Sequence, residues 1–192
     1  MSERINYQVR SKASDFKTRE ADDGLHIEGY FAVFNTIYEL WPGATESIAP
    51  GAFSQTLGND IRALIDHETR LVLGRNKAGT LTLKEDSHGL WGDILLNPND
   101  QDAVNLYERV KRGDVDQCSF GFNIVKEDTE VREDGSVHWT IREVDLHEVT
   151  VATFPAYEET SVTARKKDFE QIQKRRNEHW KLTMTKRLKG EC

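Results

Sequence analysis

The sequence predicts an α+β domain built on an antiparallel β-sheet or a β-barrel. Short segments in which apolar and polar residues alternate recur along the chain, and turn-forming residues separate them. Apolar residues at helical spacing interrupt this series between residues 99 and 112. The intervals between the predicted strands are too irregular to resemble an immunoglobulin sandwich.

The predicted strands are the segments of alternating or fully apolar character, at residues 25–34, 61–66, 80–84, 89–96, 117–126, 137–145 and 146–153. The turn-prone residues 85–88 join the third and fourth strands into a hairpin. Pro155 ends the last strand, because proline cannot donate to a strand ladder.

Two helices are predicted within this series of strands. Residues 99–112 have Asp102 in the first turn, apolar residues three and four apart, and Gly113 after the last turn. A shorter helix is predicted after Pro50, because Phe53 and Leu57 are four residues apart.

The length of 192 residues fits one domain at residues 1–160 and an appendage at residues 161–192. The appendage contains helix-forming and charged residues, but its apolar residues keep poor helical register, so we expect a partner-binding helix or a mobile tail. Residues 165–192 carry a net charge of +6, whereas residues 1–164 carry −13. An acidic domain disfavours nucleic acid as its main ligand, although the basic tail could contact RNA, DNA or an acidic protein.

We expect a soluble protein that is made in the cytosol. The sequence lacks a run of about 18 apolar residues and the apolar core of a signal peptide. Its two cysteines, Cys118 and Cys192, form neither a disulfide framework nor a metal-ligand spacing, which favours a reducing compartment. The six histidines lack the i,i+4 pairs of zinc sites, and we predict neither a metal nor a cofactor.

Ser119 is a candidate nucleophile on the predicted strand at residues 117–126. Because side chains alternate along a strand, Ser119 shares a face with Gly121, and two phenylalanines face the other way. Gly121 would leave room for a substrate carbonyl or for a second backbone that approaches closely. The alternative is a buried structural serine that is bonded to a backbone carbonyl.

His67 is the candidate base, since it follows an apolar strand and lies between Asp66 and Glu68. Its position before the serine differs from the G-x-S-x-G pattern, in which the histidine comes last, and this order disfavours an α/β-hydrolase. The alternative for His67 is a surface histidine in a charged turn.

Glu148 is the candidate third member, because strand alternation places it on the face of Leu146 and Thr150. A carboxylate on an inward face is costly unless it is paired. The alternative partner for Glu148 is a structural arginine such as Arg142 or Arg70.

The chain resembles the prohead protease family of tailed bacteriophages in six ordered blocks. These are IEGYFAVFN (27–35), IAPGAF (48–53), DHE (66–68) with LG (73–74), VKRGD (110–114), CSFGF (118–122), and LHEVTV (146–151) with FPAY (154–157). The resemblance places the family's histidine at His67 and its serine at Ser119. The family is similar to herpesvirus assemblins, which use a second histidine as third member, so His147 competes with Glu148 and ranks second because it lies on the opposite strand face.

The resemblance implies a serine endopeptidase that acts in the host cytoplasm, inside the assembling procapsid. It would cleave the scaffold protein or the scaffolding segment of the major capsid protein, and then itself. The assemblin likeness implies a β-barrel of about six or seven strands wrapped by a few helices. It also makes activation as a homodimer plausible.

Cys118 departs from the family pattern, which has a larger apolar residue such as methionine there. A thiol beside Ser119 is an alternative nucleophile. Strand alternation points Cys118 away from the face of Ser119, so we expect it to be a packing residue.

The predicted chemistry is acyl transfer, in which His67 takes the proton of Ser119 and Glu148 orients the imidazole. Two other functions remain open. One is an inactive protease fold that acts as a scaffold or capsid-interaction protein through its basic tail. The other is a cytosolic esterase without a capsid partner.

Overall fold

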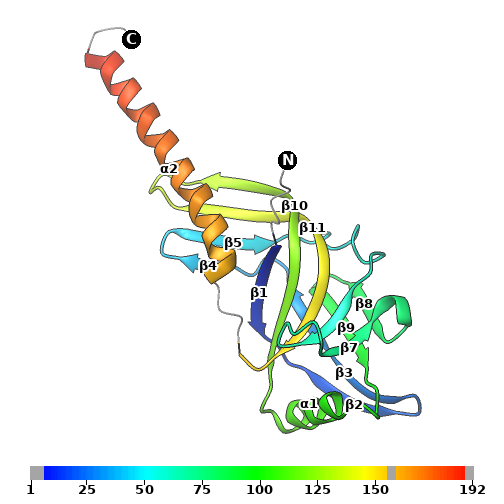
Figure 1. The fold of residues 1–192 in the computed structure, drawn as a ribbon. Helices are drawn as coiled ribbons and strands as arrows, with labels where there is room; N and C mark the ends of the chain where they lie inside the picture. Colours follow the sequence, from blue (N-terminus) through cyan, green and yellow to red (C-terminus); the bar gives the residue numbers. More distant parts are fainter. Residues whose placement is uncertain (1–6, 155–158, 189–192) are drawn as a thin grey trace.

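The computed structural model describes residues 7–154 and 159–188, and it confirms the α+β class. Within these residues, two β-sheets lie against each other, and a long helix extends from one end (Figure 1). The strands are β1 (Tyr7–Ala13), β2 (Lys17–Ala21), β3 (Gly24–Val33), β4 (Tyr38–Trp41), β5 (Ala44–Ile48), β6 (Arg62–Ile65), β7 (Val72–Arg75), β8 (Leu81–Glu85), β9 (Gly89–Leu95), β10 (Gln117–Val131) and β11 (Val137–Ala152). The helices are η1 (Asn76–Ala78), α1 (Gln101–Arg112) and α2 (Glu159–Leu188).

The seven-stranded sheet has the order β1-β10-β11-β5-β4, and β6 and β7 extend it from β11. The second sheet has the order β2-β3-β9-β8. In the described part of the chain, these pairings form two sheets and do not close into the expected barrel. The first sheet is also mixed, because β11 pairs in parallel with both β5 and β6. The parallel pairing with β6 brings the end of β6 beside the end of β11.

The main hydrophobic core lies between the two sheets. Phe31 and Ile94 of the second sheet and Phe120 and Phe122 of the first are almost completely buried in one cluster. The prediction that both phenylalanines of β10 face away from Ser119 into the core is therefore confirmed.

Several predicted elements are confirmed with small shifts of their ends, namely β3, β6, the β8–β9 hairpin and α1. Strand β10 begins where it was predicted but continues five residues further, to Val131. Helix α1 begins after Asp100, whose carboxylate accepts hydrogen bonds from the amides of Asp102 and Ala103, and it ends at Gly113 in the left-handed conformation. Residues 137–152 form one continuous strand instead of the two predicted, with residues 145 and 146 in unbroken pairing.

The helix predicted after Pro50 is wrong. The segment consists of successive turns, in which the amides of Ala52, Ser54 and Thr56 each bond to the carbonyl three residues earlier. Gly51 has a φ of +90°, and the Glu85 carboxylate binds the amides of Gly51 and Phe53. A side chain from β8 thus satisfies backbone donors that a helix would have to leave unpaired.

The C-terminal tail forms a helix, α2, as one of the two predicted alternatives has it. The first half of this helix contacts the body of the protein. Phe169 and Ile172 pack on a second cluster that contains Trp139, and the Arg165 guanidinium lies 4.8 Å from the centre of the Trp139 ring. The second half projects away from the sheets (Figure 1), and its Trp180 is 61% exposed.

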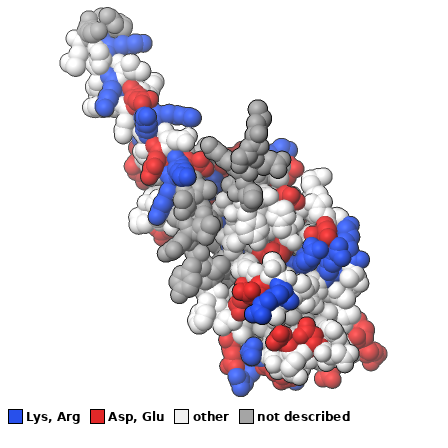
Figure 2. All heavy atoms as spheres, in the orientation of Figure 1, with Lys and Arg blue, Asp and Glu red and all other residues white. Residues whose placement is uncertain are grey.

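Lys and Arg outnumber Asp and Glu along the projecting half of α2 on the face shown in Figure 2. The domain boundary at residue 160 stays a prediction. Within the described residues, neither α-helix has a stretch long and apolar enough to span a bilayer.

Candidate active site

The strand pairings bring together three residues that are far apart in the sequence. Ser119 lies in β10 directly opposite Thr150 of β11, and Thr150 pairs in parallel with Leu64 of β6. His67 follows the end of β6 by two residues and therefore lies beside the end of β11 and the start of β10, because Ile65 pairs with Val151 and Cys118 pairs with Val151 from the other side. Glu148 lies two residues before Thr150, on the same face of β11. The prediction that Leu146 shares this face is wrong, because a register shift at His147 places Leu146 opposite Phe122 in the core.

The three side chains form a continuous hydrogen-bonded chain. His67 Nδ1 is 2.7 Å from Glu148 Oε1, and His67 Nε2 is 2.7 Å from Ser119 Oγ. Ser119 is 0% exposed and Glu148 is 6% exposed, while the His67 side chain retains 23% of its accessible surface. The imidazole thus connects a buried hydroxyl to a buried carboxylate.

The turn that carries His67 adopts a conformation that non-glycine residues rarely take. Asp66 and His67 have φ values of 46° and 61°, both in the left-handed region. The Asp66 carboxylate accepts hydrogen bonds from the amide of Thr153 at 2.7 Å and from its hydroxyl at 3.0 Å. These bonds to the end of β11 hold the turn in place. Backbone strain of this kind is concentrated at functional sites.

Glu148 has two donors besides His67. The Thr150 hydroxyl donates to Oε2 at 2.6 Å, and the Tyr7 hydroxyl donates to Oε1 at 2.9 Å. The suggested structural arginines are bonded elsewhere, since Arg142 binds Asp128 and Arg70 lies near Glu68.

His147 lies against Tyr7 and lines the same cavity as Glu148, so the prediction that it faces away from the site is wrong, but its hydrogen-bond partner is a different one. Its Nε2 lies 2.8 Å from the side-chain amide of Asn123, and its ring stacks on Tyr7 at 6.0 Å. The structure therefore pairs Glu148, and not His147, with His67.

Ser119 Oγ contacts strand β1 as well as His67. It lies 3.0 Å from the Arg10 carbonyl, which can only accept, and it receives the Ser11 hydroxyl at 3.0 Å. When the Ser119 proton points to Arg10, the short contact with His67 requires a proton on Nε2. When His67 is neutral with its proton on Nδ1, Nε2 accepts the Ser119 proton. The second arrangement is the one that a general base requires.

Gly121 leaves room for side chains instead of a backbone. A Cβ atom at this position would overlap the Tyr7 hydroxyl and the Glu148 carboxylate. The expectation that a small residue is needed here is confirmed, but the neighbours that need the space belong to the Tyr7–Glu148 contact.

Cys118 points away from this site, as alternation predicted. It is completely buried in the main core, and its Sγ lies 3.5 Å from the carbonyl of Phe31. The thiol is therefore a packing group and does not face His67.

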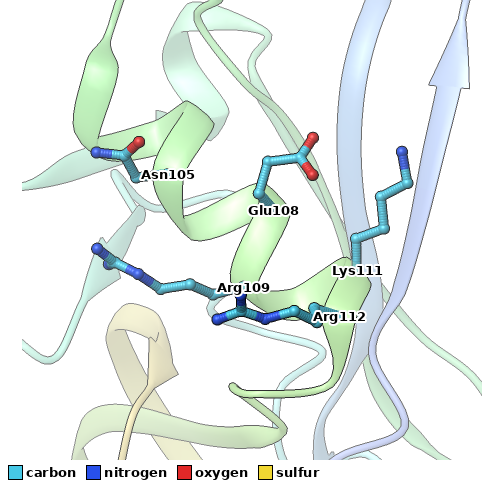
Figure 3. Close-up of a pocket in the computed structure, with 5 residues that line it drawn as sticks. All are labelled: Asn105, Glu108, Arg109, Lys111 and Arg112. Carbon is cyan, nitrogen blue, oxygen red and sulfur yellow. The ribbon is translucent and has the colours of Figure 1, made fainter.

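A cavity of about 550 Å³ opens beside the imidazole. Its lining residues are Tyr7, Arg62, Leu64, His67, Thr69, His147 and Glu148. A separate hollow of about 530 Å³ lies along α1, where the polar side chains point in different directions and include none of the candidate residues (Figure 3). In the described part of the chain, no three His, Cys, Asp or Glu side chains gather as metal ligands would.

An imidazole held between a buried serine hydroxyl and a carboxylate is the arrangement that serine hydrolases of unrelated folds share. The chain matches the Caudovirus prohead serine protease family over residues 12–175. It therefore belongs to this family, as the six sequence blocks indicated.

Two individual proteins are also similar. The prohead protease of Enterobacteria phage HK97 is 32% identical over 153 residues, which are 78% of this chain and 63% of that protein. The chain thus spans less than two thirds of the length of this relative. The bacteriophage T4 capsid assembly protease has a structure with a TM-score of 0.49 and 7% identity, over 76% of this chain and 96% of that one.

Sequence reasoning missed Tyr7, Ser11 and the carbonyl of Arg10, which all belong to β1. Residues 7–13 carry polar side chains in alternation with others, a weak strand pattern that could have been found. Their contacts, of Ser11 and Arg10 with Ser119 and of Tyr7 with Glu148, depend on the pairing of β1 with β10.

Proposed function

We propose that this protein is a prohead maturation serine endopeptidase. The observation that carries the proposal is the hydrogen-bonded chain Ser119–His67–Glu148, with two contacts of 2.7 Å, in a member of the prohead serine protease family. Ser119 is the nucleophile, His67 the general base and Glu148 the carboxylate that orients the imidazole and stabilises its protonated form.

The reaction begins when Ser119 Oγ attacks the scissile carbonyl while His67 Nε2 takes its proton. The carbon–nitrogen bond then breaks, and the imidazolium returns the proton to the leaving amine. Water hydrolyses the acyl-enzyme with His67 again as base. Because Glu148 Oε1 faces Nδ1, the imidazole keeps Nε2 directed at the serine throughout.

The proposed substrates are the scaffold protein or the scaffolding segment of the major capsid protein, followed by the protease itself. The HK97 relative is a prohead protease, which supports this assignment. The proposed place of action is the interior of the assembling procapsid in the host cytoplasm. Activation as a homodimer is part of the same proposal.

The experiment is coexpression of the full chain with its capsid protein, in wild-type form and as Ser119→Ala, Cys118→Ala and Ser54→Ala. Ser54 is an exposed serine in the turns after Pro50 and serves as the matched control. We expect Ser119→Ala alone to abolish processing, since loss of a nucleophile reduces turnover by about 10⁶. Processing that persists in Ser119→Ala would overturn the assignment of the nucleophile. Loss in a folded Cys118→Ala variant would assign the chemistry to the thiol.

A second function is supported by the burial of Ser119. Its side chain is inaccessible and its hydroxyl contacts the Arg10 carbonyl, which suits an inactive protease fold that serves as a scaffold or capsid-interaction protein. The exposed basic half of α2 would then contact the partner. Intact mass and labelling by a fluorophosphonate separate the two functions. A stable full-length chain without labelled Ser119 supports the inactive protein.

A further inference from the structure

Strand β1 contributes more contacts to the candidate site than any role assigned so far requires. Three groups of this strand reach it, namely the Tyr7 hydroxyl, the Arg10 carbonyl and the Ser11 hydroxyl. Residues 7–11 precede the segment that matches the family. The Tyr7 hydroxyl contacts Glu148, whereas the other two groups contact Ser119.

We propose that Tyr7 is a positioning residue for the protease reaction, which fixes the Glu148 carboxylate through its hydroxyl so that the carboxylate holds His67. This inference rests on the proposed function of the Ser119–His67–Glu148 chain. Tyr7 acts through Glu148 and does not take part in the transfer of the serine proton.

The geometry of the carboxylate supports this role. Glu148 Oε1 lies 2.9 Å from the Tyr7 hydroxyl and 2.7 Å from His67 Nδ1, so one oxygen receives both donors. Thr150 holds Oε2 at 2.6 Å. With both oxygens bound, the carboxylate cannot rotate without breaking a hydrogen bond to a nearly buried charged group, and such bonds are costly to lose.

The surroundings of Tyr7 are shaped for this contact. Gly121 lies where any side chain would overlap the phenol hydroxyl, and the His147 ring stacks on the phenol ring at 6.0 Å. Burial and the negative charge of Glu148 raise the pKa of Tyr7 above its ordinary value. The phenol therefore remains a protonated donor over the whole range in which a histidine base works.

The test compares four full-length proteins, namely wild type, Tyr7→Phe, Tyr30→Phe and Ser119→Ala. Tyr30 is the matched control, because its hydroxyl also donates to a carboxylate, Asp86 at 2.7 Å, on the exposed surface of the other sheet. The probe is a fluorophosphonate, which forms an Oγ–phosphorus bond and releases fluoride while His67 takes the serine proton. The labelling rate and the labelled residue are measured by mass spectrometry.

We expect Tyr7→Phe to label about tenfold to a hundredfold more slowly than wild type, as expected for loss of a hydrogen bond to a charged group. Tyr30→Phe should label within about twofold of wild type, and Ser119→Ala should not label. Phenylalanine keeps the ring that stacks on His147, so both tyrosine variants should remain folded, and Tyr7→Phe should melt at a modestly lower temperature because it loses one hydrogen bond.

A spectroscopic readout separates positioning from a general structural effect. The proton between His67 Nδ1 and Glu148 should give a far-downfield proton resonance. Removal of the competing Tyr7 donor should move this resonance further downfield, and Tyr30→Phe should leave it in place. Wild-type labelling together with an unchanged resonance in Tyr7→Phe would overturn the role of Tyr7 but leave the proposed function intact. If wild type itself is not labelled at Ser119, the proposed function fails, and the resonance alone decides whether Tyr7 orders Glu148.

Discussion

The Arg10 guanidinium binds the Glu46 carboxylate through two hydrogen bonds, of 2.6 and 2.9 Å, in the interior of the protein. Arg165 of α2 adds two more bonds to the same carboxylate, at 2.7 and 3.1 Å. Since the carbonyl of Arg10 contacts Ser119, this cluster connects the tail helix to the strand that lies against the candidate nucleophile.

Replacement of Glu46 should therefore destabilise the whole domain. Burial raises the pKa of Glu46, but Arg10 and Arg165 outweigh it and lower the pKa overall, so the carboxylate is charged in the folded protein. Glu46→Gln leaves the buried Arg10 guanidinium without a carboxylate and leaves Arg165 only its pair with Glu127, so we expect the free energy of unfolding to fall by about 3–5 kcal/mol. Urea unfolding at pH 7 measures the change. Asp128→Asn, which breaks the exposed pair with Arg142, should have a much smaller effect.

The same lowered pKa predicts how this contribution depends on pH. The Glu46 contribution is complete above the pKa of the unfolded chain and is lost as the pH falls through the lower folded value. An equal loss of stability in Glu46→Gln at neutral pH and in strong acid would contradict this linkage.

The turn at Asp66 provides a second prediction. Asp66→Ala removes both bonds to Thr153 and places alanine in the left-handed region, so His67 should lose its fixed position. We expect fluorophosphonate labelling of Ser119 to slow by about tenfold or more. Asp66→Asn should label at close to the wild-type rate, because asparagine tolerates this conformation and retains an acceptor oxygen. Should both variants label like wild type, the turn does not depend on the Asp66 side chain.

Gly121→Ala tests whether the space beside Glu148 is needed. The added methyl group must displace Tyr7 or the carboxylate, and overpacking of this kind costs about 1–3 kcal/mol of stability. We expect thermal unfolding at a lower temperature together with slower labelling. Gly58→Ala is the control, since a Cβ there meets no atom within 4 Å. A Gly121→Ala protein that matches Gly58→Ala in both assays would show that the site adapts freely.

His138 should make stability depend on pH in the weakly acidic range. Its pKa is lowered by burial and next by the charge of Arg132, and its ring nitrogens lie 2.8 Å from the Thr45 hydroxyl and 2.9 Å from the Ser47 hydroxyl. Because the unfolded chain binds this proton more readily, stability should be complete above about pH 6.5 and fall as the pH falls. Urea midpoints at pH 7.5 and pH 5.5 measure the loss, which His138→Gln should reduce. If the urea midpoints of His138→Gln at the two pH values differ by as much as those of the wild type, His138 is not the cause.

The elements that could be predicted are those whose signal is local. Helix α1 has its own cap and apolar spacing, and the β8–β9 hairpin has its own turn. The segment after Pro50 was predicted wrongly because Gly51 has a φ of +90° and the Glu85 carboxylate, 32 to 34 residues away, holds the amides of Gly51 and Phe53 in turns. Strands β4, β5 and β7 are only four or five residues long, so their own sequences carry little periodicity.

The candidate residues Ser119, His67 and Glu148 could be named from the sequence because the family blocks, and for Ser119 strand alternation, depend only on the order of residues. The alternation argument for Glu148 was wrong, because a register shift at His147 separates its face from that of Leu146. Alternation also placed Cys118 in the core and Gly121 beside the serine. The closed barrel was expected from likeness to assemblins, and the strand pairings of the described residues do not contain it.

Only the tertiary structure decided which groups contact those three residues. The parallel pairing of β6 with β11 places His67 over Ser119, and the pairing of β1 with β10 adds Tyr7 and Ser11. Such contacts join residues that lie 52 to 141 positions apart in the chain. Sequence periodicity reports which face a side chain occupies, but it contains no information about which distant strand lies alongside. That choice depends on how all strands bury their apolar faces together.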